Sequence, residues 1–245
     1  MPVNADPSFA PSPTAPPAGA LAITLPGGTP LWLLPQRAVW WPAARTAFVA
    51  DVHFGKAATF RRAGQPVPHG TTADNLARLD AVLAATGAQH LVFLGDFLHA
   101  RSGADEPLWN QLLPWRERHA GIRMTLVRGN HDLHAGDPPP TLSIALVDEP
   151  WQPVEGTEVR ACHHPLAVAG STVLAGHLHP TVTLYGLARD AARLPCFAFT
   201  PGLLVLPAFG AFTGTSSQSM APQARRFAVV GDRVVAVPRS ADPPG

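Results

Sequence analysis

Cysteine, long apolar runs and export signals are scarce or missing in this chain, and each shortage excludes a class of protein. The 245 residues include two cysteines, Cys162 and Cys196, which give neither a disulfide framework nor the paired spacing of a zinc site. No apolar run is long enough to span a bilayer, and the first residues carry no basic segment followed by an apolar one. These absences predict a cytoplasmic protein that is not exported and has no membrane partner.

Charge is also scarce, and it is nearly balanced. Charged residues make up 14% of the chain, the formal net charge is +1, and Lys56 is the only lysine. No basic tail is present, so no global field draws the chain to nucleic acid or to an acidic membrane surface. Any polyanion that it binds has to be held by local arginines or by bound metal ions.

The two ends of the chain differ in composition from its middle. Residues 1–19 are mostly Pro, Ala and Ser, and we expect a disordered leader because they cannot bury enough surface to offset the entropy of ordering. Residues 239–245 are expected to form a flexible tail. Residues 20–238 contain no linker or internal repeat, so one domain is expected. The chain is 46% hydrophobic, which is enough for one sizeable core, with two small cores as the less favoured alternative.

Five short apolar runs in the middle of the chain are predicted to be buried strands. They cover residues 46–51, 90–96, 122–132, 158–165 and 171–179. Helices are expected at residues 70–87, with Gly87 as the stop, and at residues 105–119, which Pro114 kinks or divides.

Strands are also expected near both ends of the middle region. They cover residues 21–25, 31–42, 196–210 and 225–238, the last forming a hairpin around Gly231 and Asp232. Apolar strands that alternate with helices, followed mostly by strands, predict an α/β sandwich whose sheets are covered by helices.

Each of the five predicted central strands ends in groups that bind metal ions. The side chains at these ends are Asp51 and His53; Asp96; Asn130, His131 and Asp132; His163 and His164; and His177 and His179. Strand ends gather the ligand sites of open α/β sheets, so we expect one shared pocket. In an extended segment, side chains two positions apart point the same way. This would let Asp51 and His53 share one ion and place His177 and His179 on one rim.

The mixture of side chains predicts a pair of divalent transition-metal ions. Imidazole, carboxylate and amide ligands suit Mn²⁺ first, with Fe, Co²⁺ or Zn²⁺ as alternatives, and they exclude a thiolate site. There are too many ligands for one tetrahedral ion, so two ions about 3.5–4 Å apart and bridged by a carboxylate are expected. Such a pair would lower the pKa of a shared water from about 15.7 to about 7 and would supply a hydroxide nucleophile near neutral pH.

The ordered motifs D-x-H, G-D, G-N-H-D, H-H-P and G-H-x-H resemble those of the calcineurin-like metallophosphoesterase superfamily, and they span residues 51–179. The resemblance implies a metallophosphoesterase-type α/β sandwich of two mixed β-sheets flanked by helices, over residues 20–238. It also implies two ligand sets that Asp96 bridges: Asp51, His53 and His179 on one ion, and Asn130, His163 and His177 on the other.

The same resemblance implies catalytic roles for His131 and Asp132 of the G-N-H-D motif. His131 is then a general acid toward the leaving oxygen, or a charge stabiliser on the phosphoryl oxygens, and not a ligand. Asp132 is expected to orient it. Of His163 and His164, only one is expected to coordinate, and the first after the strand is preferred.

Three longer segments resemble more narrowly the ligase-associated DNA damage response endonucleases of the PdeM type. The segments are ADVHFGKAATFRRAGQPVP, FLGDFLHARSG and LPAFGAFTGT. This resemblance implies DNA as the substrate, endonuclease activity in DNA repair, and functional association with a DNA ligase and a helicase. Phosphoprotein phosphatases of the superfamily typically continue G-D with two residues and then D-R-G. Here Phe97 to Arg101 follow, so that class is disfavoured.

Basic residues and histidines near the motifs are candidates for phosphate or DNA contacts, although a charged run is often only a solvated loop. These candidates are Lys56, Arg61, Arg62, His99, Arg101, Arg128 and His164. Three functions stay open: a DNA endonuclease, a small-molecule or nucleotide phosphodiesterase or phosphomonoesterase with the same chemistry, and a non-catalytic scaffold. The complete ligand set disfavours the scaffold.

Overall fold

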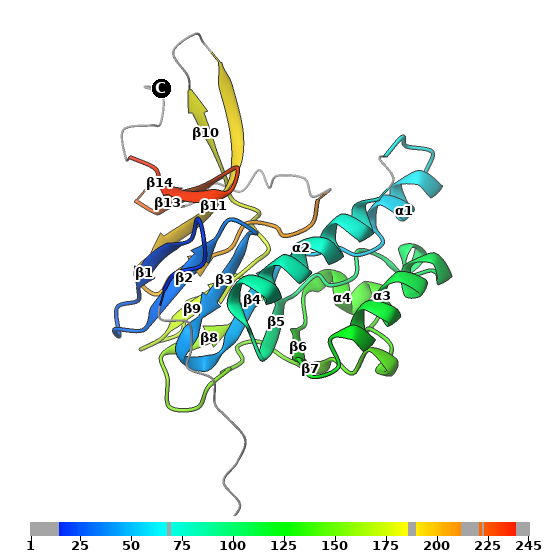
Figure 1. Cartoon of the computed structure of the whole chain (residues 1–245), viewed down its shortest axis with the longest axis horizontal. Helices are drawn as coiled ribbons and strands as arrows, with labels where there is room; N and C mark the ends of the chain where they lie inside the picture. Colours follow the sequence, from blue (N-terminus) through cyan, green and yellow to red (C-terminus); the bar gives the residue numbers. More distant parts are fainter. Residues whose placement is uncertain (1–14, 68–69, 186–189, 212–220, 222, 239–245) are drawn as a thin grey trace, which may run out of the picture.

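Two stacked β-sheets form the centre of the computed structural model, which describes residues 15–67, 70–185, 190–211, 221 and 223–238 (Figure 1). Most of the predicted leader and all of the predicted tail lie outside these residues. Within them, no helix is long and apolar enough to cross a membrane. Both cysteines are free, as the sequence predicts, and both are buried.

The first sheet follows chain order from one edge to the other. Its strands are Leu21–Thr24 (β1), Pro30–Leu34 (β2), Ala38–Trp41 (β3), Thr46–Ala50 (β4), His90–Leu94 (β5), Arg123–Val127 (β6) and Ala145–Val147 (β7). Pairing is antiparallel from β1 to β4 and parallel from β4 to β7. The single strand predicted at residues 31–42 is two strands, because the chain reverses at Arg37, whose φ is 63°.

The second sheet has the order β14-β13-β11-β12-β9-β8, with β10 paired to β11. Its strands are Val159–Ala161 (β8), Thr172–Ala175 (β9), Thr181–Tyr185 (β10), Ala191–Thr200 (β11), Leu203–Val205 (β12), Arg225–Val230 (β13) and Arg233–Ala236 (β14). The predicted last hairpin is β13–β14. The sequence predicts no strand at β10, which projects with the first half of β11 from the sandwich (Figure 1).

Alternate residues of the central strands pack into two separate cores. Phe48 and Val92 face the second sheet, whereas Val49 and Phe93 face the helices. Burial on both faces explains why β4 and β5 are continuous apolar runs. The predicted α/β sandwich of two mixed sheets with flanking helices is therefore confirmed.

The helices lie on the outer face of the first sheet (Figure 1). They are Lys56–Arg62 (α1), Thr71–Thr86 (α2), Glu106–Arg118 (α3) and Asn130–Ala135 (α4), with 3₁₀ turns at Pro42–Ala44 (η1), Arg101–Gly103 (η2) and Pro140–Leu142 (η3). α2 ends at Gly87 as predicted, and α3 continues through Pro114 undivided. α1 is a helix that the sequence does not predict. α4 begins inside the run predicted as a strand, so the motif Asn130–Asp132 starts a helix.

Candidate metal centre

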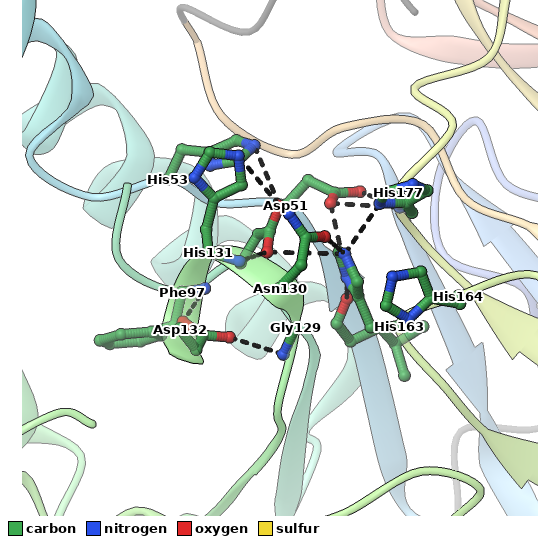
Figure 2. Close-up of polar contacts among 12 residues, drawn as sticks. Asp51, His53, Phe97, Gly129, Asn130, His131, Asp132, His163, His164 and His177 are labelled. Carbon is green, nitrogen blue, oxygen red and sulfur yellow. Dashed lines mark hydrogen bonds and ion pairs between the residues drawn. The ribbon is translucent and has the colours of Figure 1, made fainter. Parts of the chain in front are cut away.

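The loops that follow β4, β5, β6, β8 and β9 meet in one place, as Figure 2 shows. Four groups of side chains could each hold a metal ion, because within each group the possible ligand atoms lie within 4.8 Å of one another. The groups are Asp51, His53 and His179; Asp51, Asp96 and His163; His163, His164 and His177; and His53, His99 and His131. Because the groups share members, they form one continuous cluster of carboxylates and imidazoles.

Left-handed backbone conformations create this arrangement. Asp51, His53, Asp96, His177 and His179 have φ values between 44° and 69°. Such values cost a residue other than glycine roughly 1–2 kcal/mol, so surrounding contacts must hold them. The extended geometry predicted for the Asp-x-His and His-x-His pairs is therefore wrong. Asp51 and His53 still share a ligand group, but His177 and His179 belong to different ones.

Asp96 lies between the two halves of the cluster. Its Oδ2 is 3.7 Å from His53 Nε2, and its Oδ1 is 3.5 Å from His163 Nε2. The Oδ1 atom also accepts a hydrogen bond of 3.0 Å from the backbone N–H of His131. Burial, and then the charge of Asp51, raise the pKa of Asp96 to about 6. Two buried carboxylates this close repel each other, and a cation between them would stabilise both ionised forms.

Asp51 anchors the first half of the cluster from a fully buried position. Its carboxylate accepts hydrogen bonds from the backbone N–H of His177, at 3.2 Å to Oδ1 and 2.9 Å to Oδ2. Its Oδ1 is 3.5 Å from His179 Nε2. The carboxylate is therefore fixed by the loop after β9 and faces an imidazole from the same loop.

His163 organises the second half. Its Nδ1–H donates to the carbonyl of Leu94 at 3.1 Å, so its Nε2 carries a lone pair. This Nε2 lies 2.9 Å from Asn130 Oδ1 and 3.0 Å from His177 Nδ1. Potential ligand atoms from three loops thus converge on one point, which is an arrangement that suits a cation.

Glu149 separates the roles of the two adjacent histidines. It accepts hydrogen bonds from the backbone N–H groups of His163 at 2.7 Å and His164 at 2.9 Å, and its Oε1 is 2.5 Å from His164 Nδ1. The His163 side chain is fully buried in the cluster, whereas the His164 side chain is 40% exposed. The geometry favours His163 as the ligand. Glu149 had no signal in the sequence, because an isolated loop glutamate is usually solvated.

His131 and Asp132 point in different directions (Figure 2). His131 Nδ1 lies 2.9 Å from the carbonyl of His99, and its Nε2 is 4.0 Å from Asp96 Oδ2. The Asp132 carboxylate instead accepts from the N–H groups of Phe97, Leu98 and Gly129, at 2.9, 3.2 and 2.9 Å. The prediction that Asp132 orients His131 is therefore wrong. Asp132 ties the loops after β5 and β6 together, and the His99 carbonyl orients His131.

Carboxylates already bind two of the arginines predicted to contact phosphate. Arg128 pairs with Asp137 at 2.9 Å and with Asp148 at 3.2 Å. Arg62 pairs with Asp105 at 2.5 Å, the residue that caps α3. In both pairings a carboxylate neutralises the arginine that was predicted to contact phosphate. The structure therefore does not support phosphate contacts by Arg128 or Arg62.

The other basic candidates lie on or near α1. Burial lowers the pKa of Lys56 while Asp96 and Asp51 raise it, so its ammonium lies within the field of the carboxylates. Arg61 is exposed and lines a cavity of about 350 Å³ between α1, α2 and α3. Arg101 is exposed on η2, which packs against α1. His99 stacks on His131, with ring centroids 5.1 Å apart.

The buried carboxylate pair and the imidazoles all lie within residues 44–191, and these residues match the family of calcineurin-like phosphoesterases. The chain belongs to this family and is a metal-dependent phosphoesterase that uses divalent ions.

Among solved structures, the chain is similar to the nuclease MPE of Pseudomonas putida. The two are 40% identical, the alignment covers 89% of this chain and 100% of the nuclease, and the TM-score is 0.75. The E. coli phosphoesterase Yfce matches at 16% identity over 78% of this chain and 96% of its own, with a TM-score of 0.39. No curated protein matches the chain.

Proposed function

We propose that this protein is a nuclease that hydrolyses phosphodiester bonds in DNA, and that it acts as an endonuclease in DNA repair. The position of Asp96 carries the proposal, because one oxygen faces each half of the cluster and a carboxylate placed in this way can bridge two cations. The 40% identity to the P. putida nuclease supports nucleic acid as the substrate class. Association with a DNA ligase and a helicase belongs to the same proposal and rests on sequence resemblance.

Two ligand sets would hold the cations on either side of Asp96. Asp51, His53 and His179 form the first set, and Asn130, His163 and His177 form the second. The donors are imidazole nitrogens, carboxylate oxygens and one amide oxygen, a combination that fits Mn²⁺ and also accepts Fe, Co²⁺ or Zn²⁺. His53 supports this fit, because its Nδ1 is buried and has no hydrogen-bond partner. Burying an imidazole nitrogen without a partner costs free energy, and a metal ion bound by this side chain would explain the burial.

When bound, the cations activate a water molecule and offset the negative charge of the phosphate. The residues of the chain then position the substrate and move a proton. The side chain of His131 is 38% exposed, and its Nδ1–H donates to the His99 carbonyl, so its Nε2 is the atom available to the leaving oxygen. In its imidazolium form, His131 would give the proton on Nε2 to that oxygen. Lys56, beside the carboxylates, adds positive charge next to the phosphate, and Arg61 and Arg101 offer contacts to the DNA backbone.

A circular single-stranded DNA provides the test, because only an endonuclease can open a closed circle. In the presence of Mn²⁺ the protein is expected to convert the circle to linear and then shorter products. Fe²⁺, Co²⁺ and Zn²⁺ are compared under the same conditions. The Asp96→Ala variant, purified in parallel, is expected to leave the circle intact and so controls for contaminating nucleases.

The alternative substrate class has a distinct outcome in the same experiment. If the circle stays intact while the protein hydrolyses a small diester such as bis-p-nitrophenyl phosphate, the centre is catalytic but DNA is not its substrate. If neither compound is hydrolysed with any of the four metals, the proposal of a nuclease is wrong.

A further inference from the structure

The segment of residues 206–211 runs directly beside the first ligand loop. The N–H of Phe209 donates to the carbonyl of Ala50 at 2.8 Å, and the N–H of Gly210 donates to the carbonyl of Asp51 at 3.2 Å. The segment is the start of the LPAFGAFTGT motif, whose residues from 212 onward lie outside the described part of the chain. Its contacts fall where the backbone leaves β4 and enters the left-handed turn at Asp51.

Asn75 on α2 joins this segment to the ligand turn through both ends of its amide. Its Nδ2 donates to the carbonyl of Val52 at 3.3 Å, and its Oδ1 accepts from the N–H of Ala211 at 2.9 Å. Val52 is the middle residue of the Asp-x-His motif. Asn75 is 4% exposed, and a buried amide needs a partner at both ends. An asparagine supplies the required donor and acceptor in one side chain.

Two half-buried arginines bind the same segment. Arg78 Nη1 donates to the carbonyl of Phe209, and its guanidinium lies 5.4 Å from the centre of the Phe209 ring. Arg37 Nη1 donates to the carbonyls of Ala208 at 3.3 Å and Gly210 at 3.4 Å. Burial, and then the charge of Arg78, lower the pKa of Arg37 to about 10. Three consecutive carbonyls thus bind two neighbouring guanidinium groups, which fixes the backbone of the segment.

We propose that Asn75 is a positioning residue of the metal centre. By joining Val52 to the segment of residues 206–211, it holds the Asp51–His53 turn in the left-handed geometry that directs both side chains to one cation. The turn needs such support because Asp51 and His53 have φ values of 54° and 50°. The inference rests on the ligand sets proposed above and gives the LPAFGA segment a role in shaping the first of them.

The Asn75→Asp substitution tests the link with the least change of shape. It keeps the acceptor for Ala211 and replaces the donor to Val52 by an oxygen that faces a carbonyl oxygen. We expect the affinity for the cation held by Asp51, His53 and His179 to fall roughly 10-fold, as is typical when a residue that orients a ligand is lost. The cation held by the second set is expected to keep its affinity. Mn²⁺ titration followed by calorimetry and electron paramagnetic resonance separates the two.

The Thr86→Val variant is the matched control. Thr86 lies on the same helix, is 2% exposed, and uses its hydroxyl to bond the Val82 carbonyl at 2.7 Å and the Ala88 N–H at 3.2 Å. It is expected to lower thermal stability and to leave both Mn²⁺ affinities unchanged. If Asn75→Asp and Thr86→Val shift the affinities equally, or if Asn75→Asp shifts neither, the positioning role is overturned.

If Asn75→Asp does not fold, the Arg78→Gln variant tests the same link and is expected to show the same selective loss of one Mn²⁺ affinity. An unchanged affinity in that variant would count against the inference.

Two outcomes with the wild type keep the inference separate from the proposed function. Wild-type protein that binds two ions without cleaving DNA would contradict the nuclease proposal alone. Wild-type protein that binds fewer than two ions would overturn the ligand sets and this inference together.

Discussion

Replacing Asp96 by asparagine is expected to lower the rate of DNA hydrolysis by about 1,000-fold or more and to abolish the binding of the cation pair. An amide keeps the shape of the carboxylate, but it has one oxygen and one NH₂ group. The oxygens of Asp96 lie 3.7 Å from His53 and 3.5 Å from His163, so the amide would present hydrogens to one of the two ligand sets. The loss is measured as the rate of opening of circular DNA and as Mn²⁺ stoichiometry.

Thermal unfolding tests whether this loss comes from misfolding. In metal-free protein above pH 7, Asp96→Asn is expected to raise Tm by a few degrees, because it removes one of two buried carboxylates that repel each other. Mn²⁺ is expected to raise the Tm of the wild type and to leave that of the variant unchanged. Asp232→Asn, at a side chain that is 91% exposed, is the matched control and should behave as the wild type. A variant at Asp96 that is still stabilised by Mn²⁺ and still active would contradict the bridging role.

Replacing Gly95 by alanine is expected to eliminate the cation bound by the second ligand set. A Cβ at this position would lie 2.1 Å from His163 Nδ1 and 2.4 Å from its Cγ. The ring is fully buried and cannot move aside without leaving the cluster. We expect DNA hydrolysis to fall at least about 100-fold, as Mn²⁺ stoichiometry falls from two to one. The free energy of unfolding should decrease by about 2–4 kcal/mol, measured by urea denaturation.

Gly156→Ala separates this clash from the cost of the backbone conformation. Gly95 and Gly156 both have a φ of +74°, but nothing lies within 4 Å of a Cβ placed on Gly156. The control should lose roughly 1–2 kcal/mol of stability from the left-handed φ alone and keep full activity. If Gly95→Ala bound two cations with the affinity of the wild type, the packing of His163 against the loop after β5 would be wrong.

The assembly of the site could be predicted from the sequence because strand ends are easy to recognise. β4, β5 and β6 are continuous apolar runs, and each is followed closely by polar side chains that can bind a metal ion. Parallel pairing of these strands then brings Asp51, Asp96 and Asn130 to one edge. The conformation of the loops could not be predicted. The left-handed turn at Asp51 depends on bonds to Gly95 and Gly210, which are distant in the sequence.

The sequence also could not predict the roles of residues whose partners are far away along the chain. Arg62 was predicted to contact DNA, but Asp105, 43 positions away, neutralises it in the fold. Asn75 looks like an ordinary polar position of an amphipathic helix, and its role depends on Ala211, 136 positions away. Local pattern reveals burial and periodicity, whereas these pairings are decided by the packing of segments that are far apart in the sequence.

Anomalous diffraction from crystals grown with Mn²⁺ tests the central claim most directly. We expect two manganese peaks about 3.5–4 Å apart, one among Asp51, His53 and His179 and the other among Asn130, His163 and His177, with one oxygen of Asp96 on each ion. A single peak, or two peaks of which only one touches Asp96, would contradict the account of a cation pair bridged by this carboxylate.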